Sequence, residues 1–188
     1  MKTFQTKINF RWLVVFCLLG MAAVARAHDP YQAFTDVTLS SNQMEVKFSI
    51  LRFTAARLLF DNPHSTNSLP VLDEGNFDGF VPKLKQVGEK LFELTAGGTN
   101  LVPRAVDVEL NEEGDAVDFT IIYPRPPAGT LRIAAVYFKR LPHDGYGTGL
   151  GVFDEAGNQL ATADNLNLEH PFLDFKIPPM SNTPTQSK

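Results

Sequence analysis

Cysteine and tryptophan are almost absent from this chain of 188 residues, which contains one of each, Cys17 and Trp12. Both lie in the first 27 residues, a segment with the features of an export signal. A chain that has lost this segment contains no cysteine, so it can form no disulfide and depends on packing for its stability. Zinc sites built from cysteine and histidine are excluded for the same reason.

The N-terminal segment has the three parts of a secretory signal peptide. Three basic residues precede an apolar run at residues 12–25, and small residues occupy the −3 and −1 positions before His28. The run is shorter than the roughly 20 residues needed to span a bilayer. We expect cleavage after Ala27, a mature chain that begins at His28, and a periplasmic or secreted location.

Basic residues are scarce once the signal peptide is removed. The full chain has 17 Lys and Arg against 21 Asp and Glu, and residues 1–27 contain four of the basic residues and no acidic one. The mature chain therefore has 13 basic and 21 acidic residues, a net charge of −8. This charge argues against nucleic acid or an anionic membrane surface as a partner. No further apolar run reaches membrane-spanning length, so we expect no transmembrane segment in the mature chain.

Alternation of apolar and polar residues predicts a protein made mainly of β-strands. A period of two, typical of a strand with one buried face, runs through residues 44–50, 106–110, 117–123 and 131–137. Further strands are predicted at residues 37–39, 148–153, 159–162 and 172–176. Six residues that complete these alternations are expected in the core: Phe48, Phe119, Ile121, Ile133, Tyr137 and Phe153.

Two short segments have the apolar spacing of helices. Residues 54–60 can form one or two helical turns, and apolar residues spaced three or four apart from Phe80 onward predict a second helix that ends near Gly88. Short strands with regular turn signals favour an antiparallel, Ig-like β-sandwich. The predicted organisation is a signal peptide at residues 1–27, a sandwich domain at 28–177 and a disordered tail at 178–188.

The sequence contains no recognisable catalytic motif. It has no HExxH, no GxSxG, no phosphate-binding glycine loop and no GxGxxG. Neighbouring carboxylates such as Glu112 and Glu113 fall in predicted turns, where they are explained as solvated residues. The sequence therefore favours a non-enzymatic protein.

His28 has the sharpest chemical interpretation of any residue. A mature N-terminal histidine offers its α-amine and its Nδ1 to one metal ion, and a second imidazole would complete a three-nitrogen site suited to Cu(II). His143 or His170 is the candidate for that imidazole, and Asp29 or Asp144 could add a carboxylate. The alternative is that His28 only marks the cleavage point and that His170 is an ordinary surface residue.

Several short segments are similar to an extracytoplasmic domain of known membrane proteins. They are Ala-His-Asp-Pro at residues 27–30, together with residues 91–98, 103–109, 138–147 and 152–157. The chain resembles, over most of residues 27–177, the β-domain that precedes the membrane region in some members of the HupE/UreJ-like family. That family is associated with hydrogenase and urease accessory functions and includes proposed nickel permeases. Because the multi-span membrane segment is missing here, the resemblance implies an accessory domain that serves a separately encoded membrane or periplasmic protein.

Three functions follow from these observations. The first is an exported, non-enzymatic accessory or binding module. The second is a protein that binds or delivers copper or nickel through His28. The third is a copper mono-oxygenase-like enzyme, a class that also places an N-terminal histidine on a β-sandwich and needs a second histidine and an axial aromatic residue.

Overall fold

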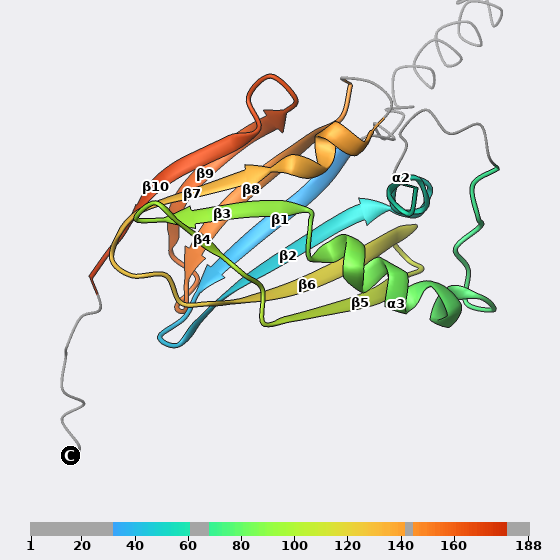
Figure 1. The fold of residues 1–188 in the computed structure, drawn as a ribbon, viewed down its shortest axis with the longest axis horizontal. Coiled ribbons are helices and arrows are strands. Elements are labelled where there is room, and N and C mark those ends of the chain that lie inside the picture. The colour runs from blue at the N-terminus through green and yellow to red at the C-terminus, as the bar shows by residue number, and fades with distance from the viewer. Residues whose placement is uncertain (1–31, 61–67, 142–144, 180–188) are drawn as a thin grey trace, which may run out of the picture. The chain divides into compact units, whose positions relative to one another are not determined.

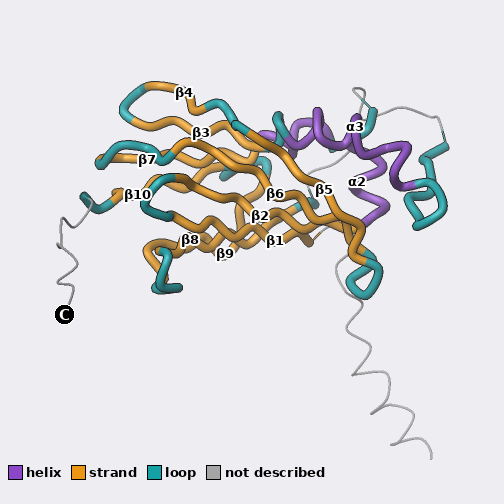
Figure 2. The backbone as a smooth tube through the Cα atoms, turned by 90° about the horizontal axis from the view of Figure 1, so that it is seen from below, coloured by secondary structure: helices purple, strands orange, loops and turns teal. Residues whose placement is uncertain are grey.

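The computed structural model describes residues 32–60, 68–141 and 145–179. These residues form two β-sheets and two short α-helices (Figures 1 and 2). The predicted β-sandwich with one or two short helices is confirmed. No helix within the described ranges is long and apolar enough to cross a membrane.

One sheet has six strands and the other has four. The six-stranded sheet has the order β5 (Ala105–Asn111), β6 (Ala116–Pro124), β2 (Gln43–Leu51), β1 (Gln32–Leu39), β8 (Gly147–Asp154) and β9 (Gln159–Asn167). The four-stranded sheet has the order β10 (Phe172–Ile177), β7 (Gly129–Ala135), β3 (Phe92–Ala96) and β4 (Thr99–Leu101). Neighbouring strands are antiparallel except β1 and β8, which run parallel with Gln32 opposite Gly147.

Inward-facing side chains of both sheets build the core. Met44, Val46, Phe48 and Ile50 alternate along β2 and are all buried, as their period of two predicts. The ring centroid of Phe48 lies 5.3 Å from that of Phe92 in β3 and 4.9 Å from that of Tyr137. Ring centroids at such distances are typical of favourable aromatic pairs. Aromatic contacts therefore join the two sheets at the centre of the core.

Five of the six core predictions are confirmed, and the prediction for Phe153 is wrong. Phe48, Phe119, Ile121, Ile133 and Tyr137 are buried. In β8, however, the inward position belongs to Val152, which is fully buried, so its neighbour Phe153 faces outward. The Phe153 ring covers Gly151, where an added Cβ would lie only 2.6 Å from Phe153 Cε2.

Tyr137 reaches the core from a 3₁₀ helix rather than from the predicted strand. Strand β7 ends at Ala135, and η1 (Val136–Arg140) follows it directly. The backbone N–H groups of Val136 and Tyr137 both donate to the carbonyl oxygen of Leu91, at 3.1 and 3.2 Å. These two bonds turn the chain out of the strand ladder while keeping the Tyr137 side chain in the core.

Both helices lie at the same end of the sandwich (Figures 1 and 2). Helix α2 (Arg52–Leu58) continues directly from β2, and α3 (Phe77–Gly88) packs on β5. The end of α3 at Gly88 agrees with the sequence prediction. A Cβ added to Gly88 would lie 2.6 Å from Val106 Cγ1, so this glycine allows the helix to approach the sheet closely.

Candidate functional site

Four of the five candidate metal ligands, His28, Asp29, His143 and Asp144, lie outside the described residues. The fifth, His170, is exposed in the turn between β9 and β10. Its backbone N–H donates to Asn167 Oδ1 at 2.9 Å. No group of three His, Cys, Asp or Glu side chains within the described ranges is arranged to hold a metal ion. The metal site therefore stays a prediction.

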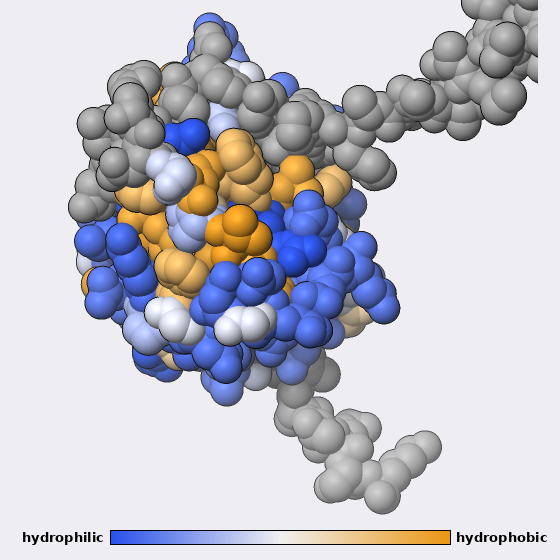
Figure 3. Space-filling view, turned by 90° about the vertical axis from the view of Figure 1, so that its right-hand side faces the viewer, coloured by the Kyte–Doolittle hydropathy of each residue, from blue (hydrophilic) through white to orange (hydrophobic). Residues whose placement is uncertain are grey.

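The helical end of the sandwich carries a groove that the sequence does not predict. Its volume is about 700 Å³, and it is lined by Arg52, Phe53 and Arg57 of α2, by residues 69–72, and by Asp115 from the β5–β6 turn. We call this feature the end groove. Figure 3 shows this end of the molecule, with a central cluster of apolar residues bordered by polar ones.

Large apolar side chains on the end groove are exposed to solvent. The other face of α2 is buried against the core, which leaves Phe53 59% exposed on the outer side. Val71, in the lining segment at residues 69–72, is 71% exposed, while its neighbour Leu72 is buried and holds the segment in place. Clustered exposed apolar side chains with a polar border are typical of an interaction surface.

Hydrogen bonds hold both walls of the end groove in position. Arg52 Nε forms an ion pair with Asp115 Oδ1 at 2.6 Å, and Arg52 Nη1 donates to the carbonyl oxygen of Leu72 at 3.3 Å. In the same 69–72 segment, the carbonyl oxygen of Val71 accepts a hydrogen bond from Asn76 Nδ2 at 2.7 Å. Hydrogen bonds therefore hold the backbone segments that carry Phe53 and Val71.

Charged side chains of both signs border the end groove. Its lining contains two guanidinium groups, on Arg52 and Arg57, and one carboxylate, on Asp115. The carboxylate is already engaged by Arg52. Glu112 also interacts electrostatically with Arg52, Glu74 and Asp73. The exposed apolar side chains of the groove are therefore bordered by charges of both signs.

Comparison with known proteins gives no family assignment. No family model matches the chain, and no curated protein matches its sequence. A solved structure of the surface layer protein SbsC, domains 1–6, aligns with 88% of this chain at 17% sequence identity and a TM-score of 0.29. The alignment spans 16% of that much longer chain. A similarity this weak supports no statement about function.

Proposed function

We propose that this chain is an exported, non-enzymatic accessory module that binds a protein partner through the end groove. The observation that carries the proposal is that two exposed apolar side chains, Phe53 and Val71, line one groove whose backbone is held by hydrogen bonds. A rigid apolar surface avoids most of the ordering cost of association. The export signal and the resemblance to an accessory domain agree with such a role.

The partner is a separately encoded membrane or periplasmic protein that presents an apolar side chain. This side chain would cover Phe53 and Val71. Covering one of these half-exposed side chains should contribute about 1–2 kcal/mol, because full burial of a large apolar side chain contributes about 1.5–3 kcal/mol. Each contact then changes affinity by roughly 5- to 30-fold.

Site-specific photocrosslinking in cells tests the proposal. The chain is exported with its own signal and carries a photoreactive residue at position 53 or 71. Position 34 is the control for position 53, because Phe34 is 60% exposed but lies in β1 and does not line the groove. Position 102 is the control for position 71, because Val102 is 73% exposed and follows β4.

We expect positions 53 and 71 to give one discrete adduct with the same protein, and positions 34 and 102 to give none. The absence of an adduct at positions 53 and 71 would contradict the proposal, as would the same adduct at all four positions. An adduct of twice the chain mass would identify a second copy as the occupant and would overturn the proposal of a separate partner.

Metal binding through His28 is the second candidate function. One observation in the described part of the chain favours it: Gly147 of β8 pairs with Asn167 of β9. In the sequence, His143 precedes Gly147 by four residues and His170 follows Asn167 by three. Two of the predicted nitrogen ligands, His143 and His170, thus each lie within four residues in the sequence of one member of the Gly147–Asn167 pair.

Titration of the metal-free mature chain tests this second function. We expect Cu(II) or Ni(II) to bind the wild type and to lose most of its affinity in His28→Ala. The affinity should rise from pH 6 to pH 8, since the α-amine and imidazole protons, with pKa values of about 7.7–8.0 and 6.5, must leave before the nitrogens can bind metal. Equal, weak binding by both chains would remove the metal function and leave the end-groove proposal untouched.

A further inference from the structure

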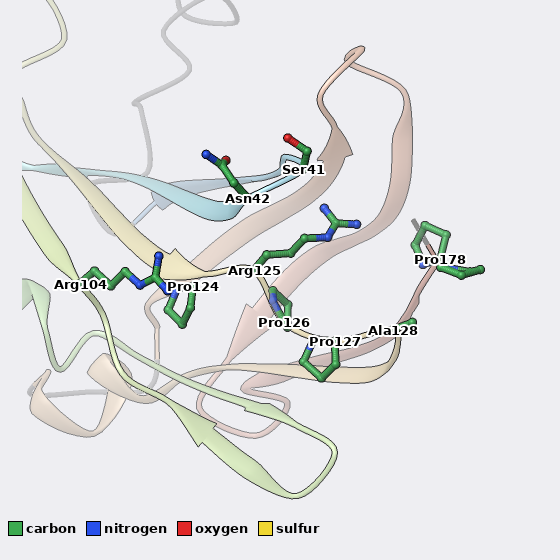
Figure 4. A pocket seen from close by; sticks show the side chains of 10 residues that line it. Ser41, Asn42, Arg104, Pro124, Arg125, Pro126, Pro127, Ala128 and Pro178 are labelled. Carbon is green, nitrogen blue, oxygen red and sulfur yellow. The ribbon is translucent and has the colours of Figure 1, made fainter. Parts of the chain in front are cut away.

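A second pocket lies at the end of the sandwich opposite the helices, where strand ends of both sheets meet (Figure 4). Its volume is about 560 Å³. It is lined by the β1–β2 turn at residues 41–42, by the β6–β7 connection at residues 124–128, by residues 178–179 after β10, and by Arg104. We call this feature the arginine pocket.

Strand pairing brings two arginines together in this pocket although they are 21 positions apart in the sequence. Arg104 precedes β5, and its backbone N–H donates to the carbonyl oxygen of Ile122 in β6 at 2.7 Å. Arg125 directly follows β6. Because β5 and β6 are antiparallel, with Ala105 opposite Ile122, the start of one strand and the end of the other bring the two residues to the same edge of the sheet. The guanidinium group of Arg104 lies beside Pro124, and that of Arg125 is directed away from it along the pocket (Figure 4).

Neither of these guanidinium groups is neutralised by a carboxylate among the described residues. Arg125 Nη1 donates to the carbonyl oxygen of Ser40, which directs the side chain toward the β1–β2 turn (Figure 4) and leaves its other N–H donors available. Arg104 is exposed, and its side chain forms no hydrogen bond or ion pair within the described ranges. Arg52 and Arg132, by contrast, are paired with Asp115 and Asp174.

The rest of the lining suits a small organic anion. The lining contains no Asp or Glu, and the side chains of Ser41 and Asn42 add hydrogen-bond donors. Five prolines, at positions 124, 126, 127, 178 and 179, supply apolar walls with a fixed backbone φ. Such walls accommodate a carbon skeleton, and their rigidity reduces the ordering cost of binding.

We propose that the arginine pocket binds a small organic carboxylate. The planar fork of a guanidinium group matches the two oxygens of a carboxylate, and charge-assisted hydrogen bonds of this kind are among the strongest in proteins. The prolines then contact the carbon body of the ligand. Two unneutralised arginines favour a ligand with more than one carboxylate over a monocarboxylate.

Isothermal titration calorimetry on the mature chain tests this site with four probes: succinate, citrate, acetate and inorganic phosphate. We expect succinate or citrate to bind at least tenfold more tightly than acetate or phosphate, and binding to weaken as salt is added. Arg104→Gln should weaken binding at least tenfold without altering the thermal unfolding midpoint, because Arg104 makes no side-chain bond in the described structure. Arg125→Gln should also weaken binding.

The control variant is Arg132→Gln, which removes the same charge at a residue outside the arginine pocket. We expect this variant to bind the carboxylate as the wild type does. Three results would overturn the proposal: no binding of either polycarboxylate at millimolar concentration, equal binding by Arg104→Gln and the wild type, or phosphate binding as tight as that of the best carboxylate. An equal loss in Arg132→Gln would also overturn it, since the effect would then reflect net charge alone.

Discussion

Arg52 and Asp115 are joined twice, by a backbone hydrogen bond of 3.0 Å from Arg52 N to Asp115 O and by an ion pair of 2.6 Å between their side chains. The first residue opens α2 and the second lies in the β5–β6 turn, where it adopts a positive φ of 48°. The same arginine also donates to the carbonyl oxygen of Leu72. One side chain therefore connects three segments that border the end groove.

This arrangement predicts unequal effects for the two partners. Asp115→Asn should lower the free energy of unfolding by less than about 1 kcal/mol, because the Asp115 side chain is 71% exposed and exposed ion pairs contribute little. Arg52→Ala should lower it further, because the Arg52 side chain is only 23% exposed and its loss also leaves the Leu72 carbonyl without this donor. Urea unfolding of both variants measures the difference, and equal effects would contradict this account.

The contact between Gly88 and the sheet predicts opposite results for two glycines of the same helix. Gly88→Ala should destabilise the protein by about 1–3 kcal/mol, because the new methyl group would lie 2.6 Å from Val106 Cγ1 and 3.2 Å from Phe119 Cδ1. Gly79→Ala should be neutral or stabilising by up to about 1 kcal/mol, because no atom lies within 4 Å of its added Cβ and alanine favours the helix. Thermal unfolding compares the pair. A stabilising effect of Gly88→Ala would show that α3 does not approach the sheet so closely.

Two buried tyrosines predict a loss of stability in alkali. The hydroxyl groups of Tyr123 and Tyr137 are buried and form no hydrogen bond of good geometry with any described residue, although a contact with Thr148 acts to lower the pKa of Tyr137. Burial is the larger effect and raises the pKa of both residues above 10.

Above pH 10 the unfolded chain releases these phenolic protons while the folded chain keeps them. The free energy of unfolding is therefore unaffected by these tyrosines below about pH 10 and falls as the pH rises further, by at most about 2.7 kcal/mol per pH unit for two groups. Urea unfolding between pH 8 and pH 12 measures this slope. Tyr123→Phe should halve it, and an unchanged slope in that variant would assign the alkaline loss to other groups.

The alternation of apolar residues was sufficient to predict most of the strands and most of the core, but not β3 or β4. The pattern from Met44 to Ile50 predicted both the extent and the buried face of β2, because a period of two leaves only one choice of inward face. The same rule misplaced Phe153, where Val152 and Phe153 are both apolar neighbours and only packing decides which of them turns inward.

The two candidate surfaces could not be predicted from sequence patterns. Arg125 occurs in a proline-rich stretch that indicates only a turn, and nothing local relates it to Arg104. Their proximity depends on the β5–β6 pairing, which is a tertiary property. Phe53 likewise belongs to a short apolar segment, and its exposure follows from the way α2 packs rather than from its spacing.

The most direct test of the central claim uses the partner identified by crosslinking. Calorimetry measures the affinity of this partner for matched pairs of serine variants of the chain. The pairs are Phe53→Ser with Phe34→Ser, and Val71→Ser with Val102→Ser, since the members of each pair share side-chain type and exposure. The account predicts that the variants at positions 53 and 71 bind roughly 5- to 30-fold more weakly than the wild type, while those at 34 and 102 bind equally well. Undiminished binding by Phe53→Ser and Val71→Ser would contradict it.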